Sequence, residues 1–154
     1  MDRRDGLGAG PMSPAAGPGA PVAAAADRGA PARAWTAFTT ILMWAVFLQA
    51  VTAGRMLTGD DWAHDVHRTA AGLLIIAAVV GGLAALVGLR DRAGGGQLGL
   101  MLVALGVGLL VQHGLGTAAA DGENTLWIHI PLGVALVALM VRLDMFARRL
   151  GRPA

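Results

Sequence analysis

Four long stretches without Asp, Glu, Lys or Arg alternate with short polar segments along most of the chain. They cover residues 35–54, 70–89, 98–115 and 126–141. An α-helix rises about 1.5 Å per residue, so stretches of about 16 to 20 residues cross most or all of a hydrocarbon core about 30 Å thick. The apolar residues run continuously, which excludes a transmembrane β-barrel, and no stretch has the polar face of a soluble bundle helix. The sequence therefore predicts an all-α membrane protein with four transmembrane helices.

The polar segments indicate where these helices begin and end. We expect helices at about residues 35–56, 62–89, 97–117 and 126–147, within a transmembrane domain of residues 34–149. Residues 1–33, rich in Ala, Gly and Pro, are expected to form a disordered cytoplasmic tail. Candidate N-caps are Asp60 or Asp61 for the second helix and Asn124 or Thr125 for the fourth.

The composition supports the membrane assignment and excludes several other classes of protein. Hydrophobic residues make up 55% of the chain and charged residues 14%, a balance too apolar for an ordinary soluble surface. Cysteine is absent, so disulfides and thiolate metal sites are excluded. The net charge of +2 does not indicate nucleic-acid binding, because the basic residues are all arginines placed around the apolar stretches.

The placement of arginines predicts the orientation of the chain. Ten of the twelve lie in the N-terminal segment, between the second and third apolar stretches, or after the fourth. Only Arg55 and Arg68 lie in the other two connections. The positive-inside rule therefore predicts a multi-pass protein of the cell membrane, with both termini in the cytoplasm and two short outer loops.

Polar residues recur at matching positions in the two halves of the chain. Gln49 and Gln112 lie near the ends of the first and third stretches, 63 residues apart. His67 and His129 open the second and fourth helices, 62 residues apart. This repetition predicts two pseudo-repeated hairpins in the same orientation, related by a pseudo-twofold axis along the membrane normal. The expected architecture is an up-down-up-down four-helix bundle.

A small residue lies one helical turn deeper in the membrane than each repeated polar residue. Ala71 follows His67 and Gly133 follows His129 at the i+4 position, on the same helix face. Ala45 and Gly108 lie correspondingly below the two glutamines. Small residues permit close contact between helices, and they also leave room for a flat ligand held by the polar group above them. Both interpretations remain open at the level of the sequence.

The topology brings six polar side chains to one layer at the outer side: Gln49, His64, His67, Gln112, His113 and His129. Ionisable residues within a membrane are energetically unfavourable, and they indicate function. The preferred hypothesis is haem b bound by His67 and His129 on opposite faces of the porphyrin. The other expected cofactor-binding residues are Gln49, Gln112, Ala71 and Gly133, together with Arg55 and Arg68.

Arg55 and Arg68 are the only arginines on the outer face, where they could pair with anionic haem propionates. They could equally extend to lipid headgroups or pair with the aspartates of the first outer loop. A haem at this depth favours electron exchange with quinone or an outer-face redox partner. Whether the protein forms oligomers is left open.

Two other classes of function fit the same residues. His64 and His67, at i and i+3, could bind copper or a divalent metal ion, with His113 or Met56 completing the site. Alternatively, the protein could be a cofactor-free helical interaction subunit in which Gly81, Gly82, Gly99 and Gly106 serve helix packing. No phosphate-binding loop or nucleophile arrangement is present, so catalysis by side chains alone is not expected.

Three short motifs resemble one four-helix half of the haem A synthase family. They are His64-Asp65-Val66-His67-Arg68, Gln112-His113-Gly114-Leu115-Gly116 and His129-Ile130-Pro131-Leu132-Gly133. The chain is also similar to small bacterial inner-membrane proteins with histidines in helices 2 and 4. The resemblance covers residues 35–148 and implies that His67 and His129 are axial haem ligands on the extracytoplasmic side. His64 stands where the synthase has its catalytic glutamate, so the resemblance implies a cytochrome b-like protein with electron transfer rather than haem A synthesis.

Overall fold

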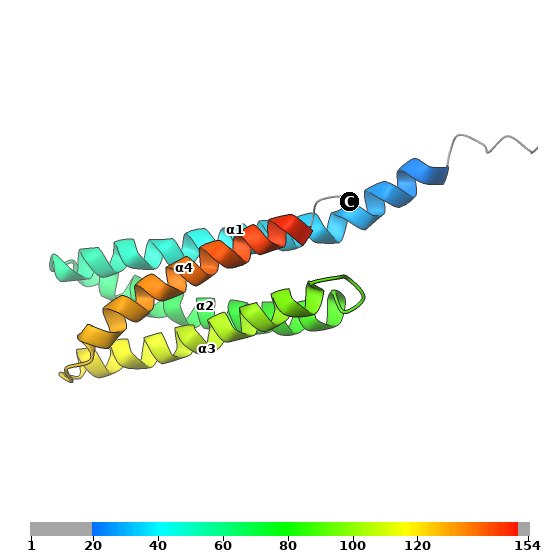
Figure 1. Ribbon diagram of the computed structural model, residues 1–154. Coiled ribbons are helices and arrows are strands. Elements are labelled where there is room, and N and C mark those ends of the chain that lie inside the picture. Colours follow the sequence, from blue (N-terminus) through cyan, green and yellow to red (C-terminus); the bar gives the residue numbers. More distant parts are fainter. Residues whose placement is uncertain (1–19, 151–154) are drawn as a thin grey trace, which may run out of the picture.

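Four helices form an antiparallel bundle in the computed structural model, which describes residues 20–150, with side chains from residue 32 onward. They are α1 (Ala20–Leu57), α2 (Asp61–Gly88), α3 (Gly95–Ala120) and α4 (Leu126–Leu150). The α1–α2 and α3–α4 turns lie at one end, and the α2–α3 connection lies at the other (Figure 1). The predicted all-α up-down bundle is confirmed.

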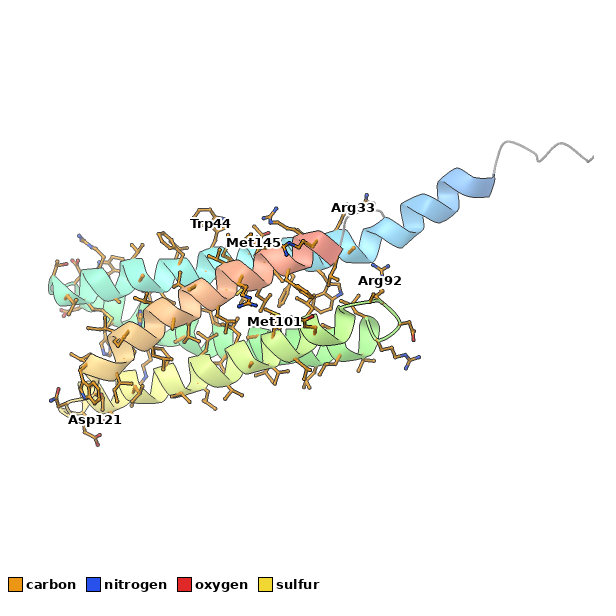
Figure 2. The ribbon with its side chains drawn as sticks, viewed as in Figure 1. Arg33, Trp44, Arg92, Met101, Asp121 and Met145 are labelled. Carbon is orange, nitrogen blue, oxygen red and sulfur yellow. The ribbon has the colours of Figure 1, made fainter. Side chains whose placement is uncertain are left out.

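The two ends of the bundle differ in their charged residues. Arg33 and Arg92 lie at the end that holds the α2–α3 connection, and Asp121 lies at the opposite end (Figure 2). We call these the arginine end and the histidine end, because all four histidines lie near the turns that join α1 to α2 and α3 to α4.

The chain turns sharply at three glycines in left-handed backbone conformation, one in each connection. Their φ angles are +88° at Gly59, +82° at Gly94 and +94° at Gly122, a region that other residues rarely adopt. At the first turn, the Asp60 amide donates to the Arg55 carbonyl and the Gly59 amide donates to the Met56 carbonyl. These bonds satisfy carbonyls at the end of α1, as in glycine-terminated helices generally.

The predicted side-chain cap of the second helix is wrong. Asp60 occupies the N-cap position of α2, but its carboxylate makes no capping hydrogen bond. It instead accepts a charged hydrogen bond from Arg55 Nε at 2.7 Å. At the start of α4, the Thr125 hydroxyl donates to the Leu115 carbonyl of α3 at 2.7 Å, so it ties two helices together rather than capping one.

The first helix begins earlier than its apolar stretch does. Residues 20–33, which we assigned to a disordered tail, are helical and continuous with the membrane segment. Alanine dominates residues 20–26 and has the highest helix propensity of any residue. The remainder of the proposed tail, residues 1–19, lies outside the described residues. The segment of α1 suited to crossing a membrane is Ala32–Leu57.

Each helix contacts its two neighbours around the bundle, α1 with α2, α2 with α3, α3 with α4, and α4 with α1. Within the described part of the chain, α1 and α3 do not contact, and neither do α2 and α4. The helices that carry His67 and His129 therefore lie diagonally across the interior.

Glycines allow α2 and α3 to approach until their backbones touch. A Cβ atom at Gly82 would lie 2.8 Å from Val103 N, and one at Gly99 would lie 2.8 Å from Leu86 N. At Gly106 it would lie 2.6 Å from a Val79 methyl carbon, and at Gly81 it would meet the Phe38 ring of α1. These four glycines serve helix packing, as their positions in the sequence indicated.

The hydrophobic core fills the bundle from the arginine end to the level of Val46, Leu74, Leu109 and Leu136. Beyond that level, the helix segments 49–71 and 112–133 contain only one buried residue, Ala63. The hydrogen bonds between Asp144 of α4 and the threonines of α1 lie between this level and the arginine end. The glycine contacts between α2 and α3 lie there too. The histidine end is thus less completely buried than the rest of the bundle.

Large apolar side chains cover the outside of the bundle. Ile41, Leu57 and Val87 are at least 69% exposed, and Trp44 points away from the other helices (Figure 2). All four helices are long and apolar enough to cross a membrane. Such a surface is stable in lipid and not in water, so the chain is a multi-pass membrane protein.

A buried carboxylate joins α1 to α4 near the arginine end. Asp144, only 3% exposed, accepts hydrogen bonds from Thr39 Oγ1 at 3.0 Å and Thr40 Oγ1 at 2.8 Å. Arg148 Nε donates to its other oxygen at 2.7 Å. Both oxygens are therefore satisfied, which permits a charge to lie inside the bundle.

Replacing this carboxylate should weaken the contact between α1 and α4. Asp144→Ala removes three hydrogen bonds to a charged group, so we expect the free energy of unfolding to fall by about 2–4 kcal/mol. The measurement is denaturant unfolding of purified protein in mild detergent. Asp91→Ala is the control, because its ion pair with Arg90 is largely exposed and should contribute under about 1 kcal/mol. Equal losses in the two variants would contradict the proposed role of Asp144.

Candidate functional site

His67 is held against α1 by reciprocal hydrogen bonds with Gln49. The glutamine Nε2 donates to the His67 carbonyl at 3.2 Å, and the His67 Nδ1 lies 3.2 Å from the Gln49 carbonyl. Thr52 Oγ1 lies 2.9 Å from the same ring nitrogen and donates its own proton to the Gln49 carbonyl at 3.0 Å. The ring is half-buried, between α1 and α2.

His129 is held against α3 in the same way. Gln112 Nε2 donates to the His129 carbonyl at 2.8 Å, and His129 Nδ1 lies 3.0 Å from the Gln112 carbonyl. Both bonds of the first hairpin thus recur in the second, between residues separated by 17 positions instead of 18. The sequence repeat of Gln and His therefore corresponds to a repeated structural contact.

These contacts define which nitrogen of each ring carries hydrogen. A backbone carbonyl can only accept, so Nδ1 must donate in both residues, and the neutral ring then has an unprotonated Nε2. No described residue forms a hydrogen bond with either Nε2. An imidazole whose Nδ1–H is held by a carbonyl is oriented to bind a metal through Nε2. Both histidines thus share the same Nδ1 contact with a backbone carbonyl.

The small residues near these histidines are used mainly for helix packing. A Cβ atom at Gly133 would lie 3.0 Å from the Gln112 amide nitrogen, and one at Gly108 would lie 2.6 Å from a Leu136 methyl carbon. The space at Gly133 that we had considered for a flat ligand holds the Gln112 side chain instead. Ala71 is half-buried, one turn below His67.

The two arginines of this end differ in their partners. Arg55 forms an ion pair with Asp60, and its side chain is 54% exposed. This agrees with the alternative in which Arg55 pairs with an aspartate of the first outer loop. Arg68 is exposed and forms no hydrogen bond or ion pair with the described residues. Arg68 is therefore the freer of the two cations to pair with an anionic group.

The remaining histidines do not complete a metal site. His64 is exposed, and its Nδ1 lies 4.0 Å from an oxygen of Asp65. His113 is half-buried on α3, and Met56 lines a shallow hollow together with His64. In residues 20–150, no group of three or more His, Cys, Asp or Glu side chains could hold a metal ion. The proposed set of His64, His67 and His113 is therefore not assembled as one site.

Sequence reasoning did not identify three features of the structure. They are the Thr52 contact with His67, the close approach of His129 Cε1 to Gly116, where a Cβ atom would lie 2.9 Å away, and the Asp144 cluster. The first could have been found, because Thr52 lies at i+3 from Gln49 and so on nearly the same face. The Asp144 cluster had a weaker signal, an i, i+4 pair with Arg148 opposite a threonine-rich turn of α1.

Comparison with known proteins identifies no relative. No protein-family model matches the chain, and no curated protein or solved structure matches it significantly.

Proposed function

We propose that the protein binds one haem b through His67 and His129 and transfers electrons near the outer face of the membrane. The observation that carries this proposal is the repeated Gln–His contact, which occupies Nδ1 of both histidines and leaves each Nε2 without a hydrogen-bond partner among the described residues. Two imidazoles that share this Nδ1 contact and lie on diagonal helices are a suitable ligand pair for a six-coordinate haem iron.

The packing of the bundle supports a ligand between the hairpins. A porphyrin is large and apolar, so its binding requires a region that side chains do not already fill. The buried core ends at Leu109 and Leu136, and only Ala63 is buried in the segments beyond that level. Gly133 and Gly108 belong to the helix contacts below, so the region expected to receive the porphyrin lies above them, toward the turns.

Arg68 is the expected partner of the haem propionates, because it is exposed and forms no hydrogen bond or ion pair with other described residues. Arg55 already forms an ion pair with Asp60, so a propionate would have to share the Arg55 guanidinium with that carboxylate. Haem b supplies one-electron transfer when bound. Its partner would be a quinone in the lipid or a redox protein at the outer face, since the site lies near the ends of all four helices.

The deciding experiment is the absorption spectrum of protein purified in mild detergent after expression with adequate haem. We expect a low-spin b-type spectrum that changes on reduction with dithionite. Absence of haem, together with copper or zinc binding that depends on His64 and His67, would favour the metal site. Absence of both would favour a cofactor-free interaction subunit, in which the Gln–His contacts only hold the helix ends together.

The orientation in the membrane has a separate test. The arginine end carries Arg33, Arg90, Arg92, Arg148 and Arg149, so we propose that this end faces the cytoplasm. Reporter fusions after residue 154 and within residues 118–122 should report opposite compartments, with the C-terminal fusion cytoplasmic. Matching compartments would contradict the topology, and a reversed pair would place the histidines at the inner face.

A further inference from the structure

The two histidines are not held equally, despite the repeat. His67 Nδ1 has two partners, the Gln49 carbonyl at 3.2 Å and Thr52 Oγ1 at 2.9 Å. His129 Nδ1 has one, the Gln112 carbonyl at 3.0 Å. The position that corresponds to Thr52, three residues after the glutamine, is Leu115 in the second hairpin, and a leucine cannot form the additional bond.

The glutamine side chains differ for the same reason. Gln49 Oε1 has the Thr52 hydroxyl as a polar neighbour at 3.4 Å, although the hydroxyl proton is donated to the nearer Gln49 carbonyl at 3.0 Å. Gln112 Oε1 is buried and has no hydrogen-bond partner in the described part of the chain. Buried acceptors without partners are rare in proteins. This free acceptor belongs to the residue that already holds His129, so it offers the His129 Nδ1–H a second acceptor when the ring moves.

The backbone below His129 is also less constrained. Pro131 lies inside α4 and has no amide hydrogen, so the helix lacks one hydrogen bond in the turn that carries His129. The corresponding residue in the first hairpin, Thr69, retains its amide hydrogen. On its other side, the His129 ring contacts Gly116, which has no side chain to hold it.

We propose that His129 is an exchangeable ligand and that a small π-acceptor gas such as carbon monoxide binds at the coordination position that it leaves, while His67 stays bound. The inference rests on the proposed haem function and adds gas binding to electron transfer. Thr52 acts as a positioning residue, since it touches the imidazole and not the haem.

The test is carbon monoxide binding to the reduced, haem-loaded protein in detergent, followed by its absorption spectrum. We expect a CO adduct to form, at a rate that stops rising at high CO because His129 must leave first. Leu115→Thr supplies the missing hydroxyl and should slow this limiting rate about 5- to 10-fold, the effect of one additional hydrogen bond. Val111→Thr, which adds a hydroxyl at an exposed position of the same helix as Leu115, is the matched control and should leave the limiting rate within about 2-fold of the wild type. Thr52→Leu removes a hydrogen bond from His67 and tests whether that ligand leaves instead.

Each contrary result has a distinct meaning. A CO rate that rises in Thr52→Leu and is unchanged in Leu115→Thr would identify His67 as the exchangeable ligand and overturn the proposal. An intact low-spin spectrum that CO does not alter would also overturn it, while the haem function would stand. Absence of any low-spin spectrum would overturn both. The spectrum of each variant before CO is added confirms that the site has formed.

Discussion

His67→Ala and His129→Ala are each expected to abolish the low-spin haem spectrum of the purified protein. Each variant removes one of the two imidazoles proposed to bind the haem iron, and a five-coordinate haem iron is high-spin, so the loss should be nearly complete in either case. We expect His129→Ala to retain more haem than His67→Ala, because His67 is held by two hydrogen bonds instead of one. Absorption spectra and haem-to-protein ratios give both quantities.

The controls for this prediction are His113→Ala and His64→Ala. His113 forms no side-chain hydrogen bond with the described residues, and His64 is exposed near the turn. Both variants should keep the low-spin spectrum. A loss of signal in His113→Ala equal to that in His129→Ala would mean that the ligand assignment is wrong, and loss in all four variants would indicate a general effect on packing.

Gly99→Leu is expected to destabilise the bundle strongly. A side chain at this position would meet Leu86 N at 2.8 Å and Gly82 O at 2.9 Å, and these backbone atoms cannot move without separating α2 from α3. We therefore expect a loss of about 3 kcal/mol or more in the free energy of unfolding, at the upper end for overpacked cores. Unfolding of the detergent-solubilised protein by increasing fractions of SDS gives the measurement.

Gly88→Leu, on the neighbouring helix α2, is the control, since nothing lies within 4 Å of a Cβ atom there. It should be neutral or slightly stabilising, because leucine favours the helix by about 0.5–1 kcal/mol relative to glycine. If both variants unfold alike, the close contact of α2 with α3 does not contribute to stability, and the role assigned to these glycines would have to be withdrawn.

The candidate site was predictable in part, because helix geometry relates sequence spacing to depth. Gln49 and His67, like Gln112 and His129, lie on either side of a turn, so two antiparallel helices necessarily bring each pair to a similar level. The sequence could not specify how the side chains would meet. The exchange of amide and imidazole bonds with backbone carbonyls depends on how each helix is rotated about its axis, which neighbouring side chains decide.

The sequence by itself determined the four membrane segments, the turns and the level of the histidines. Segment length must match the bilayer, backbone groups in lipid must bond within a helix, and glycine permits the left-handed turns. Only the tertiary structure decided that Gly133 receives the Gln112 amide, that α2 and α4 lie diagonally, and that Asp144 binds threonines 105 and 104 positions away. Hydropathy and helical period describe each helix alone, whereas these contacts depend on the mutual rotation and approach of separate helices, which close packing selects.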